Sequence, residues 1–162
     1  MTSLKTLRGV PVGIDIVCWH HAAMLIPTFE RLNNNWNAEP NAPSEEVMVR
    51  GATVSLTFVL NPWRYEATEG EKGILTFEQC SLWRLGATND EGWHLGLCRY
   101  SRVAPAFGEF YELLGDDDQR FAATDWHELE PLAARKRHFL FYLKDNTFEC
   151  FATDWRFERG SA

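Results

Sequence analysis

The strongest constraint on the fold is a strict alternation of side chains over residues 53–60. The apolar side chains and the hydroxyl-bearing side chains fall on opposite parities, with Val54, Leu56, Phe58 and Leu60 set against Thr53, Ser55 and Thr57. Successive side chains of a β-strand point to opposite faces of its sheet. The segment therefore predicts a strand with one buried face and one exposed face.

Other segments predict further strands. Residues 10–18 carry apolar side chains on one parity, and residues 74–85 are apolar at both ends. The polar centre of the second segment changes its phase, which predicts a β-bulge. The turn-like run at residues 87–92 predicts that residues 74–85 form a hairpin with residues 93–100.

The clearest hairpin lies near the end of the chain, where residues 137–144 and 147–157 flank Asp145 and Asn146. These two residues suit a two-residue turn. Counting outward from that turn gives the cross-strand pairs Leu143 with Phe148, Phe141 with Cys150, Phe139 with Ala152, and Arg137 with Asp154. The prediction is one apolar face that ends in an ion pair at the rim.

A near-repeat joins two parts of the chain, because "FAATDWHE" at residues 121–128 resembles "FATDWRFE" at residues 151–158. In the second copy Phe151 and Trp155 share a parity, which predicts that both rings lie on one face of a strand. In the first copy Asp125 and Glu128 have the spacing of a capping box, which predicts a short helix. The different expected structures indicate that the resemblance is chance.

Three segments are less regular. Apolar residues are helix-spaced over residues 19–32, although Pro27 would interrupt a helix, and we interpret this piece as helix. Residues 33–46 predict a long polar loop. Residues 105–115 fit a helix or a strand, and Gly108 and the aromatic content favour the strand.

These elements predict a mainly β fold. We expect an antiparallel sheet of about seven or eight strands, closed as a barrel or a sandwich, with one or two short helices. A length of 162 residues fits one globular β-rich domain over residues 1–162.

Charge and cysteine usage exclude several classes of protein. The formal net charge is −7, and the only basic run is residues 135–137, which disfavours binding to nucleic acid. The most apolar stretch, residues 10–26, contains Asp15 and two histidines, so we expect no membrane span. Four isolated cysteines in apolar segments indicate a reduced, cytoplasmic protein.

Motifs that would carry catalysis do not occur. The five histidines and four cysteines have no paired metal-ligand spacing, and the chain contains no nucleophile elbow and no phosphate-binding glycine loop. We therefore expect no metal and no cofactor, and the spacing favours a protein that is not an enzyme.

Aromatic–polar pairs are the remaining candidates for a site. Three tryptophans each precede a cation or a histidine, in the pairs Trp63–Arg64, Trp83–Arg84 and Trp93–His94. If these six residues gather at one opening, rings and donors would hold a small acidic or aromatic ligand. The alternative is that each ring buries area at a strand end while its polar neighbour reaches solvent.

The sequence thus predicts a non-catalytic small-molecule binding module with an aromatic-lined cavity. The alternative is an acidic protein-interaction module with a basic protein partner, of the inhibitor or toxin-immunity type. An enzyme whose site is assembled only by the fold ranks behind both.

Overall fold

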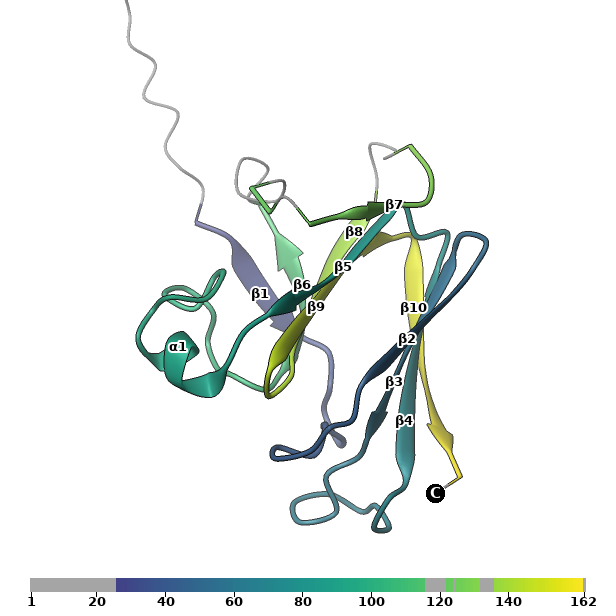
Figure 1. The fold of residues 1–162 in the computed structure, drawn as a ribbon, viewed down its shortest axis with the longest axis vertical. Helices are drawn as coiled ribbons and strands as arrows, with labels where there is room; N and C mark the ends of the chain where they lie inside the picture. The colour runs from purple at the N-terminus through teal and green to yellow at the C-terminus, as the bar shows by residue number, and fades with distance from the viewer. Residues whose placement is uncertain (1–25, 116–121, 124, 132–135, 162) are drawn as a thin grey trace, which may run out of the picture.

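Two antiparallel sheets make up the protein in the computed structural model, which describes residues 26–115, 122–123, 125–131 and 136–161 (Figure 1). The six-stranded sheet has the spatial order β1 (Thr28–Arg31), β6 (Phe110–Leu114), β8 (Arg137–Tyr142), β9 (Asn146–Ala152), β5 (Leu82–Ala87) and β7 (His127–Glu128). The four-stranded sheet has the order β10 (Asp154–Gly160), β4 (Lys72–Glu78), β3 (Thr53–Val59) and β2 (Glu46–Arg50).

The mainly β, antiparallel prediction is confirmed, but the predicted number of strands is wrong and the barrel alternative is not found among the described residues. The described ranges contain ten strands instead of seven or eight, and no closed barrel is found among them. They also contain one helix, α1 (Asp90–His94). Two segments that each look like one strand in the sequence are divided between the sheets, and β1, β2 and β7 form where no strand was predicted.

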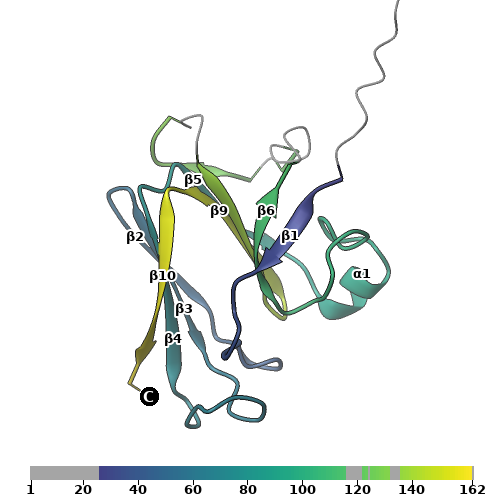
Figure 2. The same ribbon diagram turned by 180° about the vertical axis from the view of Figure 1, so that it is seen from behind.

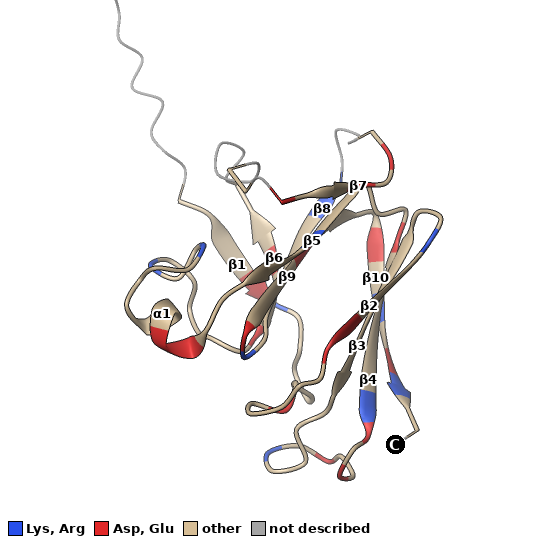
Figure 3. Ribbon diagram, viewed as in Figure 1, with Lys and Arg blue, Asp and Glu red and all other residues tan. Residues whose placement is uncertain are grey.

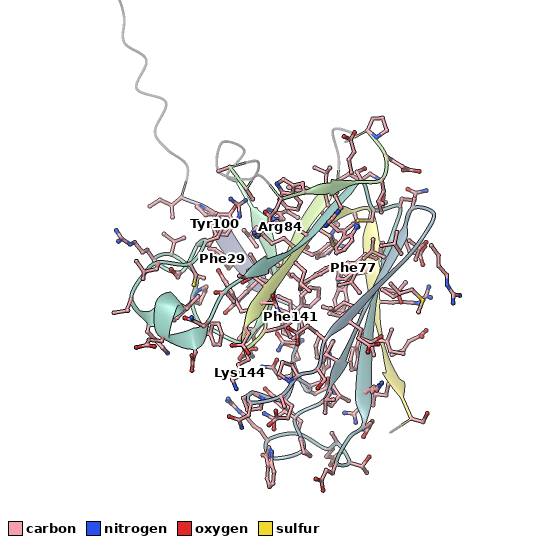
Figure 4. The ribbon with its side chains drawn as sticks, viewed as in Figure 1. Phe29, Phe77, Arg84, Tyr100, Phe141 and Lys144 are labelled. Atoms are coloured by element: carbon pink, nitrogen blue, oxygen red, sulfur yellow. The ribbon has the colours of Figure 1, made fainter. Side chains whose placement is uncertain are left out.

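One aromatic core joins the inner faces of the two sheets. Phe77 of the four-stranded sheet is fully buried, and its ring centroid lies 5.5 Å from that of Phe139 and 5.2 Å from that of Phe148. Phe58 meets Phe141 in the same way, with ring centroids 5.2 Å apart. Figure 4 shows Phe77 and Phe141 in the space between the sheets. Burial of each such ring contributes about 1.5–3 kcal/mol to stability.

Strand β3 confirms the prediction from alternation. Val54, Leu56 and Phe58 are fully buried in the core, whereas the hydroxyl-bearing residues of β3 are partly exposed on the opposite face. The predicted loop before it is also found, since regular structure between β1 and β2 is limited to one bridge from Ala38 to Leu60.

The last hairpin is present, but its register differs from the prediction by two residues. Phe141 lies opposite Phe148, and Phe139 lies opposite Cys150. The Leu143 N–H donates to the Asn146 carbonyl, so the turn residues are Lys144 and Asp145. A shift of two residues keeps every side chain on its predicted face, so the apolar face is confirmed.

The chain changes sheets where the sequence indicated a bulge. β4 ends at Glu78, Gln79 adopts a positive φ of 49°, and β5 then begins at Leu82 in the other sheet. A second change occurs at Thr153, between β9 and β10. Because of it, Phe151 and Trp155 do not share a face: Phe151 packs against Trp126, and Trp155 contacts Phe110 in the core.

Three predicted elements are wrong. The predicted strand at residues 93–100 is replaced by α1 and a loop, because the Asn89 side chain accepts a hydrogen bond from the Gly92 N–H and caps a helix. Instead of starting a helix, Asp125 binds Arg84, and β7 follows. The described end of the predicted helix at residues 19–32 forms β1 in antiparallel pairing with β6.

Two other predictions can be placed. The expected strand within residues 105–115 is found as β6. The predicted strand at residues 10–18, which includes Cys18, lies outside the described residues.

The segment between β5 and β6 covers the outer face of the six-stranded sheet (Figure 2). Rings from this segment pack with rings of the sheet in a second, smaller core. Its members include Tyr100, Tyr111, Leu113, Leu140 and Tyr142, with Phe29, Trp93 and Phe107 packed against them. This cover contributes to the burial of both faces of β8 and β9, and Trp126 also packs on Phe151 of β9.

Candidate functional site

Two charged regions lie on the six-stranded sheet or at its end, and the first surrounds Glu149. Its side chain is fully buried on the outer face of β9. Arg84 Nη1 lies 2.5 Å from Glu149 Oε1, and Arg99 Nε lies 3.0 Å from Glu149 Oε2. His138 Nε2 is also 3.0 Å from Oε2. Both carboxylate oxygens are therefore held by groups of the protein itself.

The positive groups determine the charge state of Glu149. Burial alone would raise the pKa of this carboxyl. The hydrogen bond from His138 and the attraction of His138, Arg99 and Arg84 outweigh burial, so the pKa lies below its ordinary value. Glu149 therefore stays ionised in the interior.

Arg84 extends the cluster to the surface. Its Nε and Nη2 atoms lie 2.7 and 3.0 Å from the two carboxylate oxygens of Asp125, a bidentate pair. This hydrogen bond lowers the pKa of Asp125 more than partial burial raises it. A Cβ at position 86 would lie 1.9 Å from Arg84 Nη2, so Gly86 leaves the space that the guanidinium occupies.

The second region is a pocket of about 280 Å³ at the opposite end of β8 from Arg137. Four segments line it: residues 37–40 after β1, residues 61, 64 and 65 after β3, residues 107–109 before β6, and residues 142–144 at the end of β8. Figure 4 shows Lys144 at this end of the molecule. Rings of Tyr65, Phe107 and Tyr142 contribute to the wall.

Glu109 is the buried carboxylate of the pocket, with 8% of the residue exposed. Asn33 Nδ2 donates to Glu109 Oε2 at 2.7 Å, and Asn37 Nδ2 lies 3.5 Å from the same oxygen. Arg31 Nη1 is 3.9 Å from the other oxygen. The Asn33 side chain also accepts from the Phe110 N–H, so this network connects the pocket to the start of β6.

The cations of the pocket form fewer hydrogen bonds within the described protein than its carboxylates do. Glu39 accepts hydrogen bonds from the Asn41 and Ala42 N–H groups and so stabilises its own loop. Lys144 Nζ donates to the Asn41 carbonyl, and the Arg64 guanidinium lies 5.9 Å from the centroid of the Tyr65 ring. Among the described residues, neither Arg64 nor Lys144 has a carboxylate within 4.0 Å.

The six residues predicted from the sequence as one site lie in three places. Trp63 is 81% exposed on the loop after β3, and its neighbour Arg64 lines the pocket. Trp83 stacks on His127 with ring centroids 4.4 Å apart, while Arg84 belongs to the Glu149 cluster.

The third pair lies on α1. Trp93 packs against Phe107 and Tyr142, with ring centroids 5.7 and 6.2 Å away, and His94 is exposed beside it. No ring contact joins Trp63, Trp83 and Trp93 in the described part of the chain, although Trp93 touches two residues that line the pocket. The fold therefore brings Arg64, and indirectly Trp93, to the pocket, and leaves the other four residues elsewhere.

Sequence reasoning missed most of the residues that form both regions. Glu149 had a local signal, since a carboxylate between Phe148 and Cys150 in an apolar strand indicates a buried charge with a partner. Glu109 and Lys144 had none, because acidic and basic residues beside turns are usually solvated. Their partners come from segments far apart in the sequence.

Groups of metal-ligating side chains and long apolar helices are both absent from the described residues. They contain no group of three or more His, Cys, Asp or Glu that could hold a metal ion. Cys80 and Cys150 are buried free thiols, and burial raises the pKa of Cys150. In the same part of the chain, no helix is long and apolar enough to cross a membrane.

Comparison with known protein families, with curated proteins and with solved structures gives no match to this chain. Inferences about function therefore depend on the geometry of the two charged regions.

Proposed function

We propose that the protein is a non-catalytic binding module whose pocket takes a small carboxylic acid with a planar or aromatic body. The observation that carries this proposal is the pair Arg64 and Lys144 at a pocket lined by Tyr65 and Phe107, with no carboxylate beside either cation among the described residues.

Charge argues for an acidic ligand. The lining contains two acidic and two basic side chains, but Glu39 and Glu109 already accept hydrogen bonds from the protein. Arg64 retains its full set of guanidinium donors for a ligand, and Lys144 retains two of its three N–H groups. A carboxylate between them would form charge-assisted hydrogen bonds, which are about twice as strong as neutral ones.

Size and shape argue for a small, flat ligand. A volume of about 280 Å³ lies just below the range of roughly 300–1,000 Å³ that is typical of ligand pockets. The rings of Tyr65 and Phe107 offer apolar contact area that a planar body can cover. The buried Glu109 carboxylate would repel a second acidic group, so we expect a monocarboxylate.

Calorimetric titration with a panel of small aromatic carboxylates and their uncharged amides tests the proposal. We expect at least one acid to bind, and its amide to bind about tenfold more weakly or not at all, because the amide lacks the charge that Arg64 and Lys144 attract. Arg64→Ala and Lys144→Ala should each weaken the binding of the acid.

Lys72→Ala is the matched control, since Lys72 is an exposed cation on β4 that does not line the pocket. It should leave affinity unchanged. The proposal is wrong if no acid in the panel binds, or if the amides bind as tightly as the acids.

A protein-interaction module is the second candidate, and exposed apolar side chains favour it. Trp63 is 81% exposed, and Leu95 and Leu97 after α1 are 65% and 74% exposed. Acidic residues Asp90 and Glu91 occupy the first turn of α1, shortly before the two leucines in the sequence, which would suit a basic partner. Pull-down of a basic partner that is lost in Leu95→Ser together with Leu97→Ser would favour this candidate.

An enzyme is less well supported than either. The most strongly held ionisable groups surround Glu149, which is fully buried and bound through both oxygens to Arg84, Arg99 and His138. The cytoplasmic location remains part of the proposal, and the buried free thiols Cys80 and Cys150 are consistent with a reducing compartment.

A further inference from the structure

Strand β2 is an open edge of the four-stranded sheet. Among the described residues it pairs with β3 on one side only, and it is the last strand in the order β10-β4-β3-β2. Four of its five residues are exposed, including Met48 at 55% and Val49 at 38%. An exposed edge with apolar side chains is a template for pairing with another strand.

The hydrogen bonds of β3 show toward which side each N–H and carbonyl group of β2 points. The Val59 N–H donates a hydrogen bond to the Pro43 carbonyl, which lies on the β2 side of β3. The N–H and carbonyl groups of the odd-numbered residues of β3 therefore point toward β2. The backbone N–H and carbonyl groups of their partners Glu46, Met48 and Arg50 therefore form hydrogen bonds with β3. The N–H and carbonyl groups of Val47 and Val49 consequently point outward from the edge.

The five residues of β2, Glu-Val-Met-Val-Arg, are self-complementary in one antiparallel register. When Met48 lies opposite Met48 of a second copy, Val47 lies opposite Val49, and Glu46 lies opposite Arg50. The outward groups of Val47 and Val49 then form two hydrogen-bonded pairs. Glu46 and Arg50 fall in non-hydrogen-bonded pairs, where cross-strand side chains are closest.

We propose that two copies of this chain associate through β2 in that register and form a continuous eight-stranded sheet across a two-fold axis. The interface is isologous, so each Glu46–Arg50 contact occurs twice. Figure 3 shows opposite charges at the two ends of β2, which is the arrangement that this pairing requires. The proposal is independent of the pocket, because no β2 residue lines it.

Charge also disfavours the competing arrangements. In the described part of the chain, neither Glu46 nor Arg50 forms an ion pair, so both are available to a partner. A shift of two residues in either direction removes both Glu46–Arg50 contacts. A parallel in-register pairing places Glu46 beside Glu46 and Arg50 beside Arg50, which is destabilising.

Both faces of the extended sheet tolerate the contact. On the inner face, Val47 is half-buried against the core, and Val49 would gain an apolar neighbour. On the outer face, Met48 would pack against Met48 of the second copy. The contact is small, so we expect dissociation in the micromolar range and not an obligate dimer.

Sedimentation equilibrium of the full chain, from about 1 to 200 μM, tests the proposal. We expect the mass to rise with concentration from 18.7 kDa toward twice that value. Glu46→Arg or Arg50→Glu alone should weaken association by about tenfold or more, because each places like charges opposite one another twice. The double variant E46R/R50E should restore it, since the pairs re-form with reversed polarity.

Val49→Pro provides a backbone test. It removes an outward N–H that β3 does not use, a position where an edge strand tolerates proline. We expect a folded monomer, and near-ultraviolet circular dichroism checks the fold. A monomer at every concentration overturns the proposal, and so does a dimer that persists in both single charge reversals. If Val49→Pro does not fold, sedimentation of the two single charge reversals and of the double variant still tests the proposal.

Discussion

Two buried glutamates of this protein have opposite surroundings. Glu149 is fully buried, and three cationic or imidazole groups within 3.0 Å bind its two oxygens. Glu109 is 8% exposed beside a pocket, and amide groups of Asn33 and Asn37 hold one of its oxygens. The same side chain thus serves a closed ion network at one place and the wall of an open pocket at the other.

The difference shows that burial of a charge does not by itself identify a binding site. Around Glu149, the described charges of the protein compensate one another, since Arg84, Arg99 and His138 bind this carboxylate and Arg84 also binds Asp125 at the surface. Around Glu109, the hydrogen-bond donors are neutral amides, and Arg31 lies 3.9 Å from the second oxygen. The cations Arg64 and Lys144 remain without a carboxylate in the described structure. Unused charge beside a cavity is the better indicator of binding.

The largest expected effect comes from Glu149→Gln. The substitution leaves Arg84, Arg99 and His138 in the interior without their shared carboxylate, which should cost about 3–5 kcal/mol of unfolding free energy. Urea denaturation followed by tryptophan fluorescence measures it. Glu109→Gln is the matched substitution, and it should cost only about 1 kcal/mol because the amide network can be retained. Equal losses would contradict the distinction between the two regions.

A smaller effect on the free energy of unfolding is expected when the pH is lowered. The folded-state pKa of Glu149 lies below the ordinary value of 4.5, so near that pH the unfolded chain binds more protons than the folded one. The stability that Glu149 contributes is therefore present above pH 4.5 and lost as the pH falls through the lowered pKa. We expect the difference in unfolding free energy between the native chain and Glu149→Gln to become smaller as the pH falls through this pKa.

Other carboxyl groups, including Asp125, titrate in both proteins. Subtraction of the two urea-denaturation series cancels much of their contribution. A stability difference that stays constant or grows toward acid would mean that Glu149 is not ionised in the folded state.

The smallest expected effect on stability concerns Arg64. It has no ion pair among the described residues, so Arg64→Ala should change unfolding free energy by less than about 0.5 kcal/mol. Arg84→Ala should cost several times more, because it removes a cation from both Glu149 and Asp125. Thermal denaturation of the two variants compares the regions directly. A large loss for Arg64→Ala would show that Arg64 has a structural role.

Sequence patterns predicted faces better than they predicted connections. Alternation placed Val54, Leu56 and Phe58 correctly in the core, and it placed Phe139 and Phe141 on the correct face. It did not reveal the sheet change at Gln79, because a bulge and a change of sheet interrupt the period in the same way. The predicted ion pair of Arg137 and Asp154 is present at 3.1 Å, although Ala152 is the residue opposite Arg137.

The candidate site was less predictable than the fold. Proximity in sequence suggested that Trp83 and Arg84 would act together, but neighbouring residues of a strand point to opposite faces. Trp83 accordingly faces the core, and Arg84 faces the outer cluster. Only Arg64 of the six predicted residues lines the pocket, since Trp63 points into solvent.

The sequence by itself determined the antiparallel β class and the buried face of individual strands, because both follow from local alternation and from turn residues. Only the tertiary structure decided which charges meet in the Glu149 cluster and at the pocket. Glu149 is held by groups at positions 84, 99 and 138, and the pocket combines residues 37–40, 61, 64, 65, 107–109 and 142–144. Such contacts depend on strand order and on where the chain changes sheets, which are set by packing of the whole core and not by any local pattern.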